Sequence, residues 1–184
     1  MDLITINKNV TNLTYKALNL GGVFKYFIDK GKSQIYRKKN LQLKDIHKNQ
    51  TCFILGNGPS VKGIDTSILK NKKIITVNKM INTPLFDELK PQYHCICDRL
   101  ILNEIESDIH GKLKDNKYNT TFILHRSAYK DFGKYKKCNF VYSTLIPSNK
   151  KIKADLTKNC NTFMNVLPFA IMNAIYMGFS RIIL

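Results

Sequence analysis

The sequence predicts an α/β fold in which crossover helices connect a mostly parallel sheet. From Thr51 onward, short apolar runs alternate with turn residues and with stretches compatible with helices. The turn Gly56-Asn57-Gly58 directly follows the first apolar run, where such sheets present main-chain N–H groups to ligands. With 184 residues, of which 43% are hydrophobic, the chain can form one domain with a substantial core.

Each predicted strand is a short apolar run bounded by turn-forming or charged residues. In chain order, the predicted strands are residues 52–55, 73–77, 93–97, 121–124, 139–142 and 181–184. A short helix around residues 67–69 connects the first two. The apolar stretch 162–177 predicts a helix that ends at Gly178, a residue suited to a left-handed cap. Because the last strand leaves no residue beyond its ligand-facing end, we expect a domain truncated at its C-terminus.

Residues 1–49 form a basic N-terminal segment ahead of the predicted domain at residues 50–184. The segment carries ten Lys or Arg residues and three acidic ones, and apolar residues recur at helical intervals between positions 15 and 46. This pattern predicts one or two basic amphipathic helices. They either pack on the domain or lie on an anionic membrane surface, and the pattern leaves both open.

The formal net charge of +17 predicts attraction to polyanions such as nucleotides and anionic lipids. Only four of the 30 cationic side chains are arginine, and lysine lacks the planar fork that reads bases. We therefore do not expect sequence-specific binding to nucleic acid.

The cysteine content and the first residues favour a cytoplasmic protein with reduced thiols. The five cysteines are odd in number, and the spacing of Cys95 and Cys97 matches neither a zinc knuckle nor a redox motif. The N-terminus lacks the cationic start and apolar stretch of a secretory signal. Residues 159–180 carry no formal charge, but several asparagines and Pro168 interrupt the run, which favours a buried helix over a membrane span.

The segment Gly56-Asn57-Gly58-Pro59-Ser60 predicts a phosphate-binding loop between a strand and a helix. Glycines allow close approach and positive φ, and Pro59 suits the first position of a helix. The segment lacks the Lys-Ser/Thr of a P-loop, and Val61 stands where a dinucleotide fingerprint needs its third glycine. Asn78, after the second strand, can donate to or accept from a ribose, base or phosphate.

Three stretches resemble two related families. They are CFILGNGPSVKGID from Cys52, Thr76-Val77-Asn78, and NTFMNVLPFAIMNAIYMGFSRIIL from Asn161. One family comprises bacterial sialyltransferases that use CMP-activated sialic acid. The other is the domain named after 6-hydroxymethylpterin diphosphokinases, which also occurs in flagellin glycosylation proteins and polysaccharide gene clusters. The resemblance implies a Rossmann-like, metal-independent glycosyltransferase that holds its nucleotide at the carboxyl edge of the sheet.

The resemblance also implies roles for individual residues. It assigns contact with the nucleotide phosphate and donor sugar to residues 56–60, and a binding role to Asn78. Asn161 and Thr162 stand where the sialyltransferases have a nucleotide-binding Thr-Ser-Gly element, a departure that leaves CMP as one option among several nucleotides. The sialyltransferases place their catalytic histidine beyond the strand at which this chain ends, so we expect the chain alone to lack that base.

Asp98 and His125 are the remaining candidates for catalysis, because each follows a predicted strand at its ligand-facing end. Asp98 either serves as a polar or acid/base group or pairs with Arg99. His125 either supplies a base near neutral pH or is an ordinary strand-end histidine.

These observations predict a cytoplasmic glycosyltransferase-like protein of surface glycoconjugate biosynthesis, and they leave open a peripheral location at the inner face of the plasma membrane. The expected donor is a nucleotide sugar and the expected acceptor a glycan or glycolipid, with no metal and no tightly bound cofactor. A homo-oligomer is left open. One alternative is diphosphate transfer from ATP to a pterin alcohol, with Mg²⁺ held by Asp65 and Asp98. The other is a non-catalytic nucleotide-binding module.

Overall fold

A computed structural model describes residues 37–144, 154–158, 160–161 and 165–184, without the side chains of residues 62, 143, 144 and 161. The expected helices between residues 15 and 36 lie outside the described residues. Residues 37–41 are helical, and turns connect them to the first strand.

A six-stranded parallel sheet forms the centre of the fold and confirms the predicted α/β class. Its strand order is β5-β4-β3-β2-β1-β8. The strands are β1 (Thr51–Leu55), β2 (Lys73–Val77), β3 (Tyr93–Ile96), β4 (Thr121–His125), β5 (Cys138–Val141) and β8 (Arg181–Ile183). Each lies within one residue of its predicted range at either end. A separate parallel pair joins β6 (Ser143–Thr144) to β7 (Cys160–Asn161).

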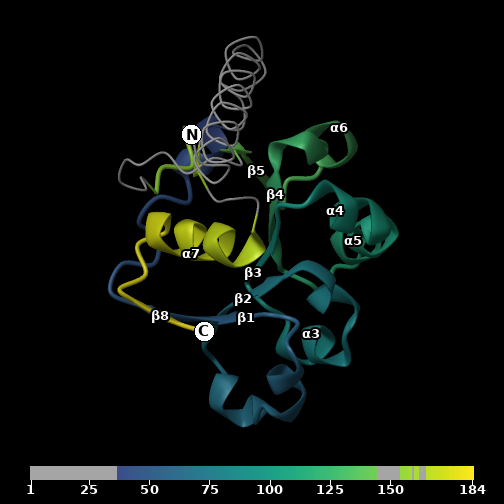
Figure 1. Cartoon of the computed structure of the whole chain (residues 1–184), viewed down its shortest axis with the longest axis vertical. Helices are drawn as coiled ribbons and strands as arrows, with labels where there is room; N and C mark the ends of the chain where they lie inside the picture. The colour runs from purple at the N-terminus through teal and green to yellow at the C-terminus, as the bar shows by residue number, and fades with distance from the viewer. Residues whose placement is uncertain (1–36, 145–153, 159, 162–164) are drawn as a thin grey trace, which may run out of the picture.

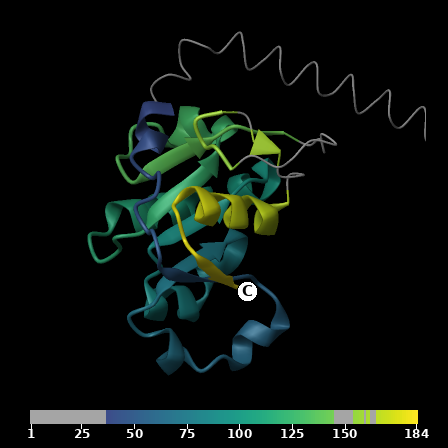
Figure 2. The ribbon, with the colours of Figure 1, turned by 90° about the vertical axis from the view of Figure 1, so that its left-hand side faces the viewer.

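Helices cover both faces of the sheet in the described part of the chain, giving the three layers of a Rossmann-like arrangement (Figure 1). The connections from β1 to β5 lie on one face. In chain order they are η1 (Pro59–Gly63), η2 (Thr66–Leu69), η3 (Asn78–Asn82), α3 (Pro84–Leu89), α4 (Arg99–Glu104), α5 (Glu106–Lys114), η4 (Arg126–Ala128) and α6 (Tyr129–Phe132). The opposite face carries α7 (Val166–Tyr176), as Figure 2 shows from the side.

The two-sided cover explains why the strands are apolar at nearly every position. On β2, Ile75 and Val77 join the core under α7, whereas Ile74 packs with Leu69 and Met80 on the other face. Cys95 and Cys97 share the α7 face of the sheet, as the two-residue alternation predicts. All five cysteines are buried thiols that take part in no disulfide.

α7 follows β7 in the chain and leads to β8, the last strand of the sheet. Gly178, just after the helix, has a φ of +88°, which confirms the predicted left-handed cap. A Cβ on Gly178 would also lie 3.0 Å from the Cα of Asp45. Within the described residues, no helix is both long and apolar enough to cross a membrane.

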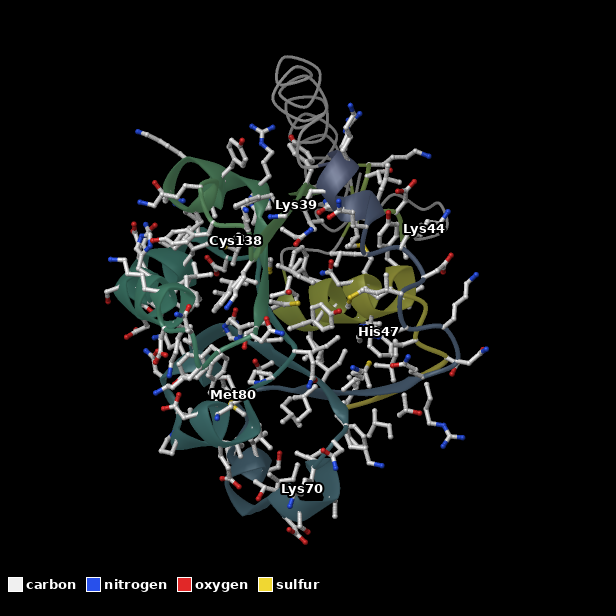
Figure 3. All side chains as sticks on the ribbon, turned by 180° about the vertical axis from the view of Figure 1, so that it is seen from behind. Lys39, Lys44, His47, Lys70, Met80 and Cys138 are labelled. Carbon is white, nitrogen blue, oxygen red and sulfur yellow. The ribbon has the colours of Figure 1, made fainter. Side chains whose placement is uncertain are left out.

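Residues 37–41 cover the outer edge of β5. Lys39 Nζ donates to the carbonyl oxygens of Lys136 and Cys138, and the Asn40 amide donates to those of Phe140 and Leu156. Lys39 and Cys138 are labelled in Figure 3. Because Asn40 is fully buried, this part of the basic segment is packed on the domain.

The strand order places a topological switch between β1 and β8. The chain moves outward from β1 to β5 and then returns through α7 to pair β8 with the free side of β1. In open α/β sheets, ligands bind beyond the carboxyl ends of the strands at such a switch. The Gly-Asn-Gly turn follows β1, so the fold places it at this point.

Candidate functional site

The sequence-predicted polar residues lie along one edge of the sheet. The loop at 56–60 follows β1, Asn78 follows β2, Asp98 comes soon after β3 and His125 ends β4. The register pairs Val77 with Cys95 and Ile96 with Leu124, so these strand ends are level. Because neighbouring strands lie about 4.8 Å apart, the loop and His125 are separated by about 14 Å along the edge.

The loop after β1 leaves main-chain amides available to a ligand. Pro59 opens η1 as predicted, and Val61 N donates to Gly58 O over 3.1 Å. Among the described residues, no acceptor engages the N–H groups of Asn57 and Gly58. Asn57, Gly58 and Ser60 are all exposed.

Neither the backbone conformation nor the packing of the protein requires glycine at the two loop positions. The expectation of positive φ is wrong here, because Gly58 has a φ of −66° and the one described glycine with positive φ is Gly178. A Cβ on Gly56 would meet nothing within 4 Å, and one on Gly58 would meet only Ser60 Oγ at 3.7 Å. Protein packing therefore does not require glycine at either position, whereas close approach of a ligand would.

A cavity of about 640 Å³ opens beside the loop, on the face that carries α3. The Asn57-Gly58 turn forms one wall, and η3 with the start of α3 forms the other. The lining is apolar at Val61, Ile64 and Met80 and polar at Lys79 and Glu88. Its volume lies within the usual range of about 300–1,000 Å³ for small-molecule sites.

Asn78 adopts an unusual backbone conformation at the end of β2. Its φ is +51°, in the left-handed region that non-glycine residues seldom enter. Its Oδ1 is buried and has no hydrogen-bond partner in the described part of the chain. Since native proteins leave few buried polar atoms unpaired, this atom marks a position that packing alone does not explain.

Lys79 contributes a cation that sequence analysis did not single out. It lines the cavity, and its Nζ lies 2.6 Å from Glu104 Oε2 on α4. Both side chains are about half exposed, so the pair can exchange with an anionic ligand. Its position directly after Asn78 was the available signal, but the general excess of lysine concealed it.

Asp98 is held as the N-cap of α4. Its Oδ1 accepts a hydrogen bond of 2.8 Å from Leu100 N. The suggested pair with Arg99 does not form, because the Arg99 guanidinium donates to Asp131 Oδ2 over 3.0 Å. The carboxylate is at the sheet edge as predicted, but it already has a structural partner.

His125 is likewise engaged at the end of β4. Its Nδ1 lies 2.9 Å from Ser127 Oγ and accepts from Ser127 N over 3.3 Å, which caps the short helix η4. Its ring packs near Tyr142, with 6.5 Å between the ring centroids. The fold brings His125 to the predicted edge, on the strand next to that of Asp98.

The second predicted nucleotide-binding element is only partly visible. Asn161 belongs to β7, but its side chain is outside the description, and Thr162 lies outside the described residues altogether. Where the structure is described, no group of three His, Cys, Asp or Glu side chains could hold a metal ion.

The comparisons with known proteins place the chain in one family. Neither curated proteins nor solved structures gave a match. The profile of the 6-hydroxymethylpterin diphosphokinase MptE-like family matches residues 30–184, which includes the strands, the loop and the helices described above. The chain therefore belongs to the 6-hydroxymethylpterin diphosphokinase MptE-like family.

Proposed function

We propose that the protein binds a nucleotide-activated sugar at the carboxyl edge of its sheet and acts in sugar transfer during surface glycoconjugate biosynthesis. The observation that carries this proposal is the loop after β1. Its Asn57 and Gly58 amides are without acceptors among the described residues, and its glycines leave room for a ligand at the topological switch. Family membership gives a broad link to pterin diphosphokinase-like and glycosylation-associated proteins.

The chemistry of the surroundings suits a phosphate ester with an organic substituent. Two main-chain amides and Lys79 can bind oxyanions, while the apolar wall at Val61 and Met80 can pack against a ring. The formal charge of +17 attracts a nucleotide sugar from solution.

In the proposed reaction, the acceptor hydroxyl displaces the nucleotide at the anomeric carbon of the sugar. The bond from the anomeric carbon to the acceptor oxygen forms while the bond to the phosphate oxygen breaks. The loop amides and Lys79 stabilise the negative charge that develops on the departing phosphate. Asp98 and His125 are candidates for removing the acceptor proton, although each must first give up a cap interaction.

The proposed acceptor is a glycan or glycolipid at the inner face of the plasma membrane. The positive charge of the chain supports peripheral contact with anionic lipids. The proposal includes a cytoplasmic location. It leaves open whether the nucleotide is CMP or another one, and whether the protein forms a homo-oligomer.

Calorimetric titration of the full chain with CMP-, UDP-, GDP- and ADP-sugars tests the binding step. We expect one of the four to bind with a dissociation constant between about 1 μM and 1 mM. Binding at one site, competed by the free nucleotide, would support the proposal. Absence of binding by all four would contradict it.

Diphosphate transfer from ATP to a pterin alcohol is the second candidate, favoured by the family to which the chain belongs. The reaction would require Mg²⁺ near the phosphates. The suggested carboxylates both serve as caps, because Asp65 accepts from Ser67 N as Asp98 does from Leu100 N. Magnesium-dependent formation of AMP from ATP and 6-hydroxymethylpterin would establish this candidate over sugar transfer. Nucleotide binding without turnover of either substrate pair would indicate a non-catalytic module.

A further inference from the structure

A second cavity lies at the amino edge of the sheet, on the face that carries α3. Its volume is about 530 Å³, within the usual range for small-molecule sites. The turn at residues 70–72 leads into β2, and Gln92 stands directly before β3, so this cavity lies at the start of the strands. The first cavity lies beside the loop at 56–60, which follows the end of β1. The second cavity is therefore distinct from the one assigned to the nucleotide.

The two cavities are neighbours that share part of their lining. Thr66 and Glu88 line both of them. Figure 3 labels Lys70 from the second cavity and Met80 from the first, and both lie in the half of the molecule away from residues 37–41. Among the described residues of either lining, Glu88 is the one carboxylate, so a ligand in either cavity can reach it.

Two lysines give the second cavity its positive charge. Lys70 and Lys72 both line it and are exposed, and neither forms an ion pair within the described residues. Asn71 between them has a φ of +62°, in the left-handed region that asparagine enters more readily than most residues. This sharp turn allows both flanking lysines to line one cavity. With Glu88, the lining carries two positive formal charges and one negative charge, so it favours an anion.

Gln92 adds a fixed hydrogen-bonding group to the second cavity. Its Oε1 accepts a hydrogen bond of 2.7 Å from Ile74 N at the start of β2. Because the main-chain N–H needs an acceptor, the amide nitrogen of Gln92 must be turned away from Ile74. The two N–H groups on that nitrogen have no acceptor among the described residues. They can therefore donate to hydroxyl or carboxylate oxygens of a ligand.

The rest of the lining suits a sugar ring. Thr66 and Ser67 add hydroxyl groups, and Leu69 and Leu89 add apolar surface. A sugar carries hydroxyl groups around its rim and apolar C–H groups on its faces. Its hydroxyls can donate to the carboxylate of Glu88 and accept from an amide. A sugar that also bears a carboxylate or a phosphate matches the two lysines.

We propose that the second cavity binds an acidic sugar. The carboxylate or phosphate of the sugar lies at Lys70 and Lys72, and its hydroxyls lie at Glu88 and Gln92. The site goes beyond the proposed function, because it requires neither a nucleotide nor sugar transfer. It allows the protein to hold an acidic glycan whether or not the loop at 56–60 is occupied.

Amide NMR of the full chain tests the site by titration with glucuronate, glucose 6-phosphate, glucose and inorganic phosphate. We expect the acidic sugars to shift the amides of residues 70–72 and the side-chain amide of Gln92, with a dissociation constant of about 1 mM for ligands of this size. The tighter of the two identifies the anion as carboxylate or phosphate. Glucose and inorganic phosphate each lack part of the recognition and are expected to bind at least about fivefold more weakly.

Two results of this titration would overturn the proposal. If glucose or inorganic phosphate bound as tightly as the acidic sugars, the cavity would not recognise the combination of sugar and charge. If neither acidic sugar shifted these amides at about 20 mM, the cavity would not be a site for this class of ligand.

The double variant Lys70→Gln/Lys72→Gln removes both positive charges from the lining. We expect its affinity for the tighter acidic sugar to fall at least about tenfold, because charge-assisted hydrogen bonds are lost. The matched control is Lys38→Gln/Lys44→Gln, which removes two exposed lysines that line neither cavity; Lys44 lies in the opposite half of the molecule in Figure 3. The control is expected to stay within about twofold of the unmodified chain. Equal losses in the two double variants would reveal general charge attraction and overturn the proposal.

Glu88→Gln separates recognition of the sugar from attraction of an anion. Removing a negative charge strengthens a pure anion site, whereas losing the bonds from sugar hydroxyls to the carboxylate weakens a sugar site. We expect Glu88→Gln to bind the acidic sugar about 3- to 10-fold more weakly and inorganic phosphate no more weakly than the unmodified chain. Tighter binding of the acidic sugar by this variant would overturn the proposal. Failure of every nucleotide sugar to bind would contradict the proposed function alone.

Discussion

The ends of β1 and β2 differ from the ends of β3 and β4 in what their polar groups already do. After β1, the amides of Asn57 and Gly58 have no acceptor among the described residues, and after β2 the Oδ1 of Asn78 is unpartnered. After β3 and β4, Asp98 and His125 cap the elements that follow them. A polar side chain at the ligand-facing edge is therefore not necessarily available to a ligand, because the same edge also supplies the caps of the helices that follow the strands. Among the described residues at this edge, the polar groups without protein partners therefore lie at the ends of β1 and β2.

The largest expected effect comes from filling the space at Gly58. Its φ of −66° and ψ of 155° suit a residue before proline, so Gly58→Val leaves the free energy of unfolding nearly unchanged. The valine side chain would occupy the space next to the amides. We expect nucleotide affinity to fall by about 30- to 100-fold, because a hydrogen bond to a charged group contributes about 1.5–3 kcal/mol. Calorimetric titration and thermal unfolding measure the two effects.

Gly63→Val is the matched control, because Gly63 is exposed, a Cβ there meets nothing within 4 Å, and it does not line the cavity. Equal loss of affinity in both variants would show that the loop responds to any bulk and would remove the special role of Gly58.

The next largest effect is a pH dependence of stability from His94, which lies on β3 and is hydrogen-bonded to Thr76 of β2. The folded pKa is about 3, below the value of about 6.5 in an unfolded chain. Between these values the unfolded state binds a proton that the folded state excludes. The free energy of unfolding therefore falls as pH falls through this window, with a slope of up to about 1.4 kcal/mol per pH unit.

Denaturant unfolding between pH 7 and pH 5 compares the unmodified chain with His94→Gln. His47, whose pKa is also lowered mainly by burial, contributes equally to both chains and cancels in the difference. Parallel pH profiles for the two chains would show that His94 titrates normally in the folded state, contrary to its burial.

A smaller effect tests whether Asp98 is mainly a cap. Asp98→Ala removes the acceptor for Leu100 N and is expected to lower the free energy of unfolding by about 1 kcal/mol. Asp98→Asn keeps an N-cap oxygen and is expected to restore most of that loss. Both variants are expected to bind nucleotide within about threefold of the unmodified chain, because the lost cap hydrogen bond lowers the stability of α4 and removes no proposed ligand contact. A tenfold loss of nucleotide affinity in Asp98→Asn would show that the binding site includes the end of β3. It would contradict the difference drawn between the ends of β1 and β2 and those of β3 and β4.

The smallest expected effect concerns the ion pair of Lys79 and Glu104. Glu104→Gln is expected to change stability by less than about 0.5 kcal/mol, because exposed pairs contribute little. Releasing Lys79 should raise nucleotide affinity by about twofold at low salt. Glu106→Gln serves as the control, because Glu106 lies near His110 Nε2 on α5 and does not line the cavity. Weaker binding in Glu104→Gln would mean that Glu104 orients Lys79 instead of competing for it.

The strands of the sheet could be predicted from the sequence because they are buried on both faces and therefore appear as continuous apolar runs. The sequence also located the loop, Pro59 at the start of η1 and the cap at Gly178. The conformation of the loop glycines could not be predicted, because open space and positive φ both favour glycine. The cap roles of Asp98 and His125 depend on short helices of six and three residues, which carry little periodic signal. The hydrogen bond between Thr76 and His94 joins two strands, so no local sequence pattern contains it.

Amide NMR during titration with the tightest-binding sugar nucleotide tests most directly whether the loop after β1 receives the phosphate. We expect the largest shifts at the amides of Asn57 and Gly58, with smaller ones at Asn78. Largest shifts at the amides following Asp98 and His125, with Asn57 and Gly58 unmoved, would contradict the assignment of the site.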